Sequence, residues 1–235
     1  MIPISVIKTG SVLPVAGADL WLDGADPDAF VLDNVVRVAV WIDKTDNHHF
    51  ALQSTASSLR PTYGSRQIAG YTVPEFSSAQ RIDTQSHPND DRTSTGFIVA
   101  LLDAITGSPT LWASAAGTDG NHFLVGDGAG NLVTNQEFVA EIARNTLAAV
   151  SVGSQFLAVQ RLTATAVEQI LDGVSETDAD SSTFTASRFT RLGQMHNGGQ
   201  TLNGLIAEVV RFPFTLTDQE LADMTLYLKT KWRTP

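Results

Sequence analysis

The chain has 235 residues, of which 43% are hydrophobic and only 17% are charged, and its formal net charge is −10. Its 15 Lys and Arg residues are scattered, which argues against the clustered basic surface that binds nucleic acid phosphates. The absence of cysteine excludes a disulfide framework and a thiolate metal site. A composition this rich in neutral polar residues favours a β protein over a helical bundle.

The hydropathy pattern argues against two further classes. Residues 1–8 lack the basic region and apolar core of an export signal, so we expect synthesis in the cytoplasm. No apolar run approaches the length that spans a bilayer, so no membrane insertion is expected. The length suits one all-β domain over residues 1–235, with residues 1–17 as an N-terminal arm or edge segment.

Short apolar runs separated by Gly, Pro, Asn and Asp dominate the chain. Asp-Gly pairs at 23–24, 119–120, 127–128 and 172–173 and the Gly-Gly pair at 198–199 provide turn chemistry between them. This spacing predicts an all-β sandwich or barrel. The predicted strands are Leu20–Leu22, Val35–Ile42, Phe50–Gln53, Phe97–Leu102, Leu111–Ser114, His122–Gly126, Ala148–Gly153, Phe156–Leu162, Val167–Leu171, Phe189–Gly193 and Leu205–Phe212.

Two hairpins stand out in the middle of the chain. The first spans Gly120–Asn135 and reverses through a glycine-rich turn, because glycine adopts the positive φ angles that such a turn requires. The second pairs Phe156–Leu162 with Val167–Leu171. Two polar segments, Pro61–Asp91 and Ser175–Ser187, are predicted to be irregular.

One segment near the C-terminus has helical periodicity. Thr217 followed three positions later by Glu220 forms a capping box, which marks a helix N-terminus. Four apolar residues then recur at helical spacing, and they are Leu221, Met224, Leu228 and Trp232. We therefore expect a closing amphipathic helix over 216–232 that lays an apolar stripe on the sandwich.

The two ends of the chain carry matching signatures. The N-terminal one is Leu-Trp-Leu-Asp-Gly-Ala-Asp-Pro at 20–27, followed by Trp-Ile-Asp-Lys-Thr-Asp-Asn at 41–47. The C-terminal one is Leu-Asn-Gly-Leu-Ile-Ala-Glu-Val-Val at 202–210, followed by the helix. Together they resemble the laminin-G-like modules of the concanavalin A-like superfamily that occur in bacterial surface proteins and phage structural proteins. The resemblance implies a two-sheet antiparallel jelly-roll sandwich with one short C-terminal α-helix.

Several of these signature residues are expected to have structural roles. Trp21 and Trp41 are large apolar groups in strands and are expected to anchor the core. Asp43 begins a run of turn-forming residues that can bond their own backbone. Glu208 lies on a strand beside Ile206 and Val210, so we expect it to be partly buried and paired.

No catalytic motif is recognised. Glucanases with this fold carry a Glu-x-Asp-x-x-Glu strand, and this chain has no such string. Glu137 and Glu141 are spaced like surface carboxylates, and no Gly-x-Ser-x-Gly elbow is present. We therefore expect a protein that is not an enzyme and needs no cofactor.

Ligand binding is the remaining kind of site. A sugar site combines an aromatic platform with polar side chains, and Trp112 is the candidate platform, with a core position as its alternative. Calcium is the candidate ion, because Asp119 and Asp127 offer hard oxygen ligands in predicted loops, where aspartates also commonly make turns. The full set of candidate ligand-binding residues is Trp112, Asp119, Asn121, His122, His196 and Asn197.

These features favour a non-catalytic binding or structural module. The leading hypothesis is a phage virion protein (a head decoration, fibre, spike or tail component) that contacts host surface glycan. Its partners would be other virion proteins or further copies of itself, together with cell-surface polysaccharide. The first alternative is a purely architectural assembly module, and the second is an extracellular or cell-surface bacterial carbohydrate-binding domain.

Overall fold

The structure is a computed structural model that describes most of the chain. The described residues are 12–33, 36–47, 49–53, 55–84, 93–106, 109–114, 120–125, 131–137, 141–179, 190–194 and 198–235. For β11, β12 and nearly all of β13, only the backbone is described.

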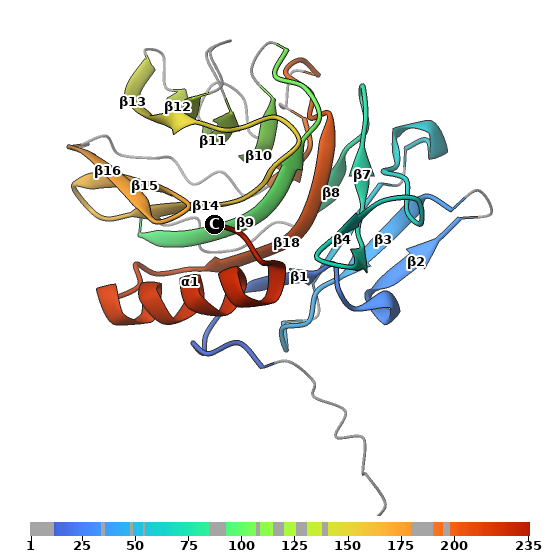
Figure 1. The fold of residues 1–235 in the computed structure, drawn as a ribbon, viewed down its shortest axis with the longest axis horizontal. Coiled ribbons are helices and arrows are strands. Elements are labelled where there is room, and N and C mark those ends of the chain that lie inside the picture. The colour runs from blue at the N-terminus through green and yellow to red at the C-terminus, as the bar shows by residue number, and fades with distance from the viewer. Residues whose placement is uncertain are drawn as a thin grey trace, which may run out of the picture.

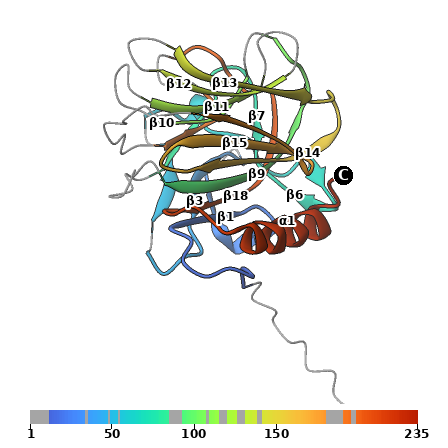
Figure 2. The same ribbon diagram turned by 90° about the vertical axis from the view of Figure 1, so that its left-hand side faces the viewer.

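Two antiparallel sheets and one helix form three layers (Figures 1 and 2). In the described part of the chain, the seven-stranded sheet has the order β1 (Leu20–Asp23), β18 (Gly204–Phe212), β9 (Ser94–Leu102), β14 (Gln155–Leu162), β15 (Ala166–Leu171) and β16 (Val174–Ala179), and β7 (Glu75–Phe76) also pairs with β18. Helix α1 (Asp218–Trp232) lies beneath this sheet, on the side away from β10 to β13 (Figure 1).

The nine-stranded sheet forms the other half of the sandwich. Within the described residues its order is β13 (Glu141–Ala149), β12 (Asn131–Glu137), β11 (Gly120–Val125), β10 (Thr110–Ser114), β17 (Thr190–Leu192), β8 (Ile82–Thr84), β4 (Phe50–Leu52), β3 (Val38–Ile42) and β2 (Phe30–Leu32). Smaller elements are the hairpin of β5 (Gln67–Ile68) and β6 (Tyr71–Thr72) and the 3₁₀ turns η1 (Pro27–Ala29) and η2 (Ser57–Leu59). The predicted β sandwich with one C-terminal helix is confirmed.

The central strands of the seven-stranded sheet, β18, β9 and β14, are buried on both faces because two apolar layers cover them. In β9, Phe97 and Val99 belong to the core under the helix, whereas Ile98, Ala100 and Leu102 belong to the core between the sheets. This alternation follows from the two-residue period of a strand. All nine residues of β18 are buried for the same reason, with Ile206 and Val209 in the core between the sheets and Leu205, Ala207 and Val210 in the core under the helix.

Side chains bond the free backbone groups at both ends of helix α1. The Thr217 hydroxyl accepts the amide hydrogen of Glu220, and the Glu220 carboxylate accepts the amide hydrogen of Thr217, so the predicted capping box is confirmed. At the other end, the Gln155 side-chain amide donates to the carbonyl oxygens of Trp232 and Arg233 at 2.8 and 2.7 Å. These bonds satisfy helix carbonyls that have no partner within the helix.

Several strand predictions were wrong. Val174–Ala179, placed mostly in an irregular loop, is the edge strand β16, because an exposed edge tolerates polar residues that hide the strand pattern. The segment after Pro61, also predicted to be irregular, contains four short strands, β5 to β8. The strand expected at Ala148–Gly153 ends at Ala149, where the longer strand β13 finishes.

The hairpins and the core tryptophans agree with expectation. β11 pairs with β12, and β14 pairs with β15. Trp41 is fully buried between the sheets, and Trp21 is buried under the helix. In the predicted N-terminal arm, Val15 also enters the core under the helix.

Candidate functional site

The outer face of the nine-stranded sheet is the candidate binding face. The seven-stranded sheet has α1 against one face and the nine-stranded sheet against the other. The nine-stranded sheet turns its inner side chains into the core, including Trp41, Ala51, Ile82, Leu192 and Trp112. Its outer face is the other broad sheet surface, exposed at the β2 end, where Val31 is 49% exposed, and buried at Ala113 of β10.

Strand register aligns one row of residues across this outer face. Directly paired residues share a face of the sheet, so their side chains are neighbours. The described members of the row are Val31, Val40, Leu52, Asp83, Arg191 and Ala113. The backbone pairing continues the row to positions His122, Asn135 and Arg144.

An ion pair lies in the middle of this row. The Arg191 Nε atom lies 2.6 Å from Asp83 Oδ1, and both side chains are largely buried although they belong to the outer face. Together they present a guanidinium and a carboxylate on a fixed β scaffold, and such groups can donate to and accept from the hydroxyls of a ligand. Sequence reasoning missed both residues, because Asp83 lies in a segment expected to be irregular and Arg191 carries no motif.

The row becomes apolar toward β2. Val40 pairs with Val31 on one side and Leu52 on the other, and Ile42 pairs with Phe50 two residues along. An outer sheet face usually carries polar residues, so this apolar end is unusual. The sequence shows that Val38–Ile42 is apolar, but it does not show which of its side chains turn to the outer face.

Trp112, the proposed aromatic platform, belongs to the core between the sheets. It is 7% exposed and packs in the core cluster with Leu192. Its ring lies over Gly96, where an added Cβ would come within 1.7 Å of Trp112 Cη2. The core alternative is therefore the one that the structure supports, because strand register turns Trp112 inward and its neighbour Ala113 outward.

The other candidate residues are only partly placed. Asn121 and His122 are adjacent in β11, so their positions alternate across the sheet, and His122 joins the outer row by pairing with Ala113. Their side chains lie outside the described set. Asp119, Asp127, His196 and Asn197 also lie outside the described residues, so the calcium hypothesis at Asp119 and Asp127 stays a prediction.

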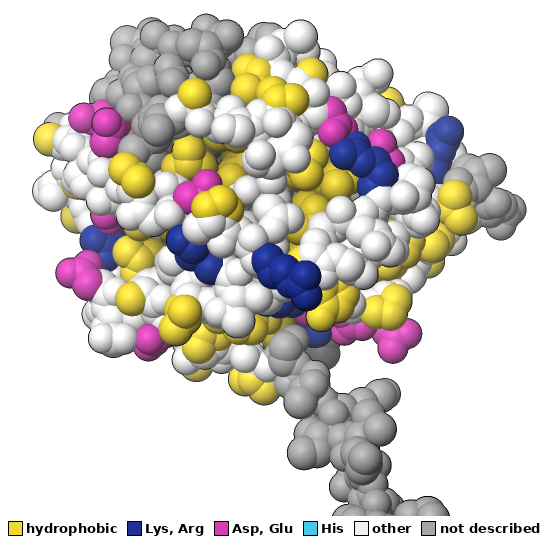
Figure 3. Space-filling model, viewed as in Figure 1, with side chains coloured by type: hydrophobic (Ala, Val, Ile, Leu, Met, Phe, Trp, Pro, Cys, Tyr) yellow, Lys and Arg dark blue, Asp and Glu magenta, His cyan; other side chains and the backbone are white. Residues whose placement is uncertain are grey.

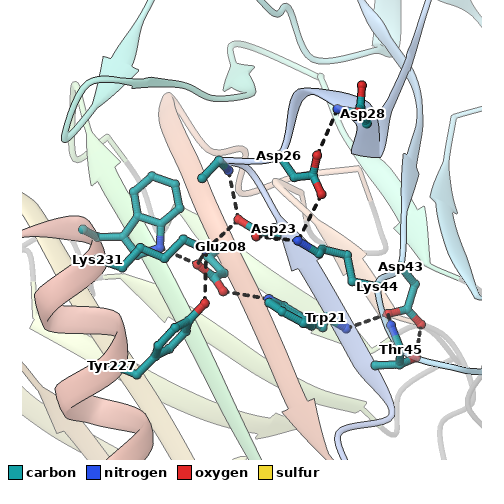
Figure 4. A network of polar contacts seen from close by, with 12 residues as sticks. Trp21, Asp23, Asp26, Asp28, Asp43, Lys44, Thr45, Glu208, Tyr227 and Lys231 are labelled. Atoms are coloured by element: carbon teal, nitrogen blue, oxygen red, sulfur yellow. Dashed lines mark hydrogen bonds and ion pairs between the residues drawn. The ribbon is translucent and has the colours of Figure 1, made fainter. Parts of the chain in front are cut away.

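A buried polar network joins both chain ends under the sheet (Figure 4). Lys231 Nζ of α1 lies 2.7 Å from Asp23 Oδ1 and 2.7 Å from Glu208 Oε2. Glu208 also accepts from the indole nitrogens of Trp21 at 2.7 Å and Trp232 at 2.5 Å. The expectation of a paired Glu208 is confirmed, although its burial is complete rather than partial.

A β-bulge places Glu208 in this network. In the pairing of β18 with β9, Ile206 lies opposite Ala100, but the next paired residue, Glu208, lies opposite Val99. The extra residue reverses the alternation, so Glu208 shares the helix-facing side with Val99. Without this bulge the carboxylate would enter the apolar core between the sheets.

The charges of the network balance locally. Burial opposes ionisation of Asp23, but Lys231 and Lys44 outweigh burial and lower the pKa of this carboxyl. Burial also disfavours the charged form of Lys231, but Glu208 and Asp23 outweigh it and raise the pKa of the ammonium. Burial raises the pKa of Glu208 despite the attraction of Lys231.

The network extends to the surface through Lys44 and the turn after β3. Lys44 Nζ lies 3.0 Å from both Asp23 and Asp26, and it lies 4.7 Å from the Trp21 ring centre. Asp43 accepts from the backbone amides of Trp21 and Thr45, which confirms the expected turn. Because the Glu208 carboxylate is enclosed and neutralised by lysine, this network fastens β1, β18 and α1 together.

The described residues contain neither a cluster of metal ligands nor a helix that could cross a membrane. Among them, no group of three or more His, Cys, Asp or Glu side chains is arranged to hold a metal ion. Their one α-helix falls short of the length and apolar character needed to cross a bilayer.

Comparison with known proteins gives similarity at the level of structure. No family model and no curated sequence matches the chain. Domain 4 of AbnA, an extracellular arabinanase from Geobacillus stearothermophilus, in complex with arabinotriose, has a TM-score of 0.69 at 12% identity, covering 89% of this chain and 98% of that domain.

Two further solved structures share the fold. The binding domain of botulinum neurotoxin serotype D has a TM-score of 0.64 at 11% identity, covering 90% of this chain and 51% of that one. Trypanosoma rangeli sialidase has a TM-score of 0.62 at 13% identity, covering 96% of this chain and 35% of the sialidase. The chain thus spans about half of the toxin domain and about a third of the sialidase. These neighbours are β-sandwich structures that include carbohydrate- and receptor-binding domains, which agrees with a jelly-roll-like fold.

Proposed function

We propose that the protein is a non-catalytic module that binds polysaccharide on the outer face of its nine-stranded sheet. The observation that carries this proposal is the row on the outer face, in which the half-buried Asp83–Arg191 pair lies beside Leu52 and Val40. Sugars offer hydroxyls to charged groups and C–H surfaces to apolar ones, and this row supplies both.

The structural neighbours support a binding role. One is a domain of an arabinanase in complex with arabinotriose, and it is matched over nearly its whole length. Another is the binding domain of a neurotoxin. The buried state of Glu208, whose carboxylate is shared with Lys231, also supports a role other than catalysis for the network beneath the sheet.

We further propose a virion location, in a head decoration, fibre, spike or tail component that contacts host glycan. This part of the proposal depends on the resemblance of the two end signatures to modules of phage structural proteins. An architectural module is the second candidate, because the apolar end of the outer face suits protein contacts. Gene neighbours that encode capsid and tail proteins would support the virion location, and neighbours that encode secreted polysaccharide-degrading enzymes would contradict it.

Glycan binding is tested with an array of bacterial and plant polysaccharides, followed by titration of the best ligand. The variant Arg191→Gln removes the guanidinium from the outer face. The control Arg66→Gln removes a guanidinium that pairs with Asp103 elsewhere. We expect Arg191→Gln to weaken binding at least about tenfold, the scale of one charge-assisted hydrogen bond, and Arg66→Gln to leave it unchanged.

Two results would count against this proposal. Equal affinity of the two variants would move the site away from the outer face. A wild-type protein that binds no polysaccharide on the array would exclude the glycan role and favour the architectural module. Circular dichroism of each variant establishes that the fold is intact.

A further inference from the structure

The two sheets have four edges in the described part of the chain, and three of them are protected. The edge strand β1 is covered, because Lys44 donates its amide to Trp21 O at 2.9 Å and Trp21 donates to Asp43 at 2.8 Å. The edge strand β16 carries two acidic residues, the exposed Glu176 and the half-buried Asp178. The edge strand β13 carries charged residues in its sequence, beginning with Glu141. Coverage and charge are the devices that prevent an edge from pairing with another strand.

The fourth edge, β2, has no such protection. Its sequence is Phe30-Val31-Leu32, without charge, and Val31 is 49% exposed. No described element lies beyond β2 in the ribbon view, and hydrophobic side chains gather on that side of the surface (Figures 1 and 3). The apolar surface continues from Val31 onto Val40 and Ile42 of the outer face. An uncharged edge next to an apolar face is a surface that favours association.

The turn after β2 adds a strained apolar residue. Val36 has a φ of 57°, in the left-handed region that a β-branched residue rarely adopts. Its backbone is held there by bonds from Val36 N to Asp33 O and from Tyr63 N to Val36 O. The side chain is 58% exposed, so it contributes little to packing within the monomer. Backbone strain that packing within the monomer does not offset points to a residue that contacts a binding partner.

We propose that β2 pairs with β2 of a second copy of this chain across a twofold axis near Val31. The distribution of charge favours a second copy of this chain over a basic partner. The chain carries −10, so a basic partner would be attracted to its acidic surfaces, whereas β2 is neutral and the nearby Asp33 is paired with Arg60 at 3.0 Å. A neutral strand is the surface through which two like-charged copies can meet.

The strand composition is also self-complementary. Antiparallel pairing about Val31 places Phe30 of one copy opposite Leu32 of the other, so apolar groups meet on each side of the axis. The nine-stranded sheets would then join, and the row Leu52–Val40–Val31 would continue into its symmetry mate. This proposal does not depend on glycan binding.

Sedimentation equilibrium at several protein concentrations and two salt concentrations tests the dimer. We expect the wild type to approach twice the chain mass of 25.2 kDa. Added salt should strengthen association, because it screens the repulsion between two negative copies. The variant Val31→Lys places a charge on the edge and should remain at the mass of one chain.

The matched control is Val174→Lys, which places the same charge on the other exposed edge, where Val174 is 60% exposed. It should dimerise like the wild type. The variant Val36→Gly relieves the backbone strain, so it should fold at least as well as the wild type and dimerise more weakly. A wild type that stays at one chain mass at millimolar concentration would overturn the proposal, and so would equal masses for Val31→Lys and Val174→Lys.

Discussion

Replacing Lys231 by Met removes the cation at the centre of the buried network. Lys231 contacts Asp23 and Glu208 at 2.7 Å each, and the Glu208 side chain has no exposed surface. Methionine fills similar space but leaves two neighbouring carboxylates without their shared partner. Removing one member of a buried ion pair costs about 3 to 5 kcal/mol, a large part of the stability of an ordinary domain.

The pH dependence of this loss follows from the same charges. The raised pKa of Lys231 means that its contribution is complete below its unfolded value and is lost only at alkaline pH. The lowered pKa of Asp23 means that its contribution is present above its unfolded value of 3.8 and is lost in acid. In the Met variant, repulsion and burial raise both carboxyl pKa values. The variant therefore regains part of its stability as the pH falls below neutral and Glu208 takes up a proton.

Urea denaturation of the wild type and of Lys231→Met at neutral and at mildly acidic pH measures the free energy of unfolding that the substitution removes. The control is Lys229→Met on the same helix, because Lys229 donates to one backbone carbonyl, Asp172 O, at 3.2 Å. We expect the control to lose less than about 1 kcal/mol, as is usual for a partly exposed cation. Equal losses for the two variants, or the same loss for Lys231→Met at both pH values, would show that Lys231 does not neutralise the buried carboxylates.

Three further predictions concern packing, capping and a second carboxyl. Gly96→Ala should destabilise the fold by about 1 to 3 kcal/mol in thermal unfolding, because the new methyl group meets the Trp112 ring. Adding Trp112→Phe makes room for the methyl group and should restore part of the lost stability. A double variant that recovers no stability would contradict this contact. Thr217→Ala should cost about 1 kcal/mol by removing the cap of α1, whereas Thr217→Ser should cost much less. Burial raises the pKa of Asp19 to about 6 against the attraction of Arg211, which NMR titration should detect. Because its folded pKa is raised, the Asp19 carboxyl opposes folding above its unfolded pKa of 3.8, by about 3 kcal/mol near neutral pH. Asp19→Asn should therefore flatten that part of the curve of stability against pH. An unchanged curve would exclude the pKa shift.

The sequence predicted the elements whose chemistry is local. The helix start was recognisable because Thr217 and Glu220 bond each other within one turn. The turn at Asp43 was recognisable because its carboxylate bonds the amide two residues on. The edge strand β16 was missed because its central residues Ser175, Glu176 and Thr177 are polar and exposed, so no apolar alternation marks it.

The candidate site was harder to predict, because it depends on which face each strand turns outward. Trp112 looked like a platform, but register turns it inward onto Gly96 and places the smaller, buried Ala113 on the outer side. Asp83 and Arg191 are 108 residues apart and carry no shared motif, so only strand pairing brings them together.

By itself, the sequence determined an all-β chain of short strands with one C-terminal helix, since turn residues, capping residues and hydrophobic periodicity act over a few positions. The resemblance of its two end signatures implied the sandwich. The tertiary structure alone decided how the layers use these elements. A single bulged residue in β18 sends Glu208 under the helix to Lys231, and an uncharged three-residue strand becomes the unprotected edge of a sheet. Both results depend on register and sheet order, which pair residues far apart in the chain and so leave no local pattern.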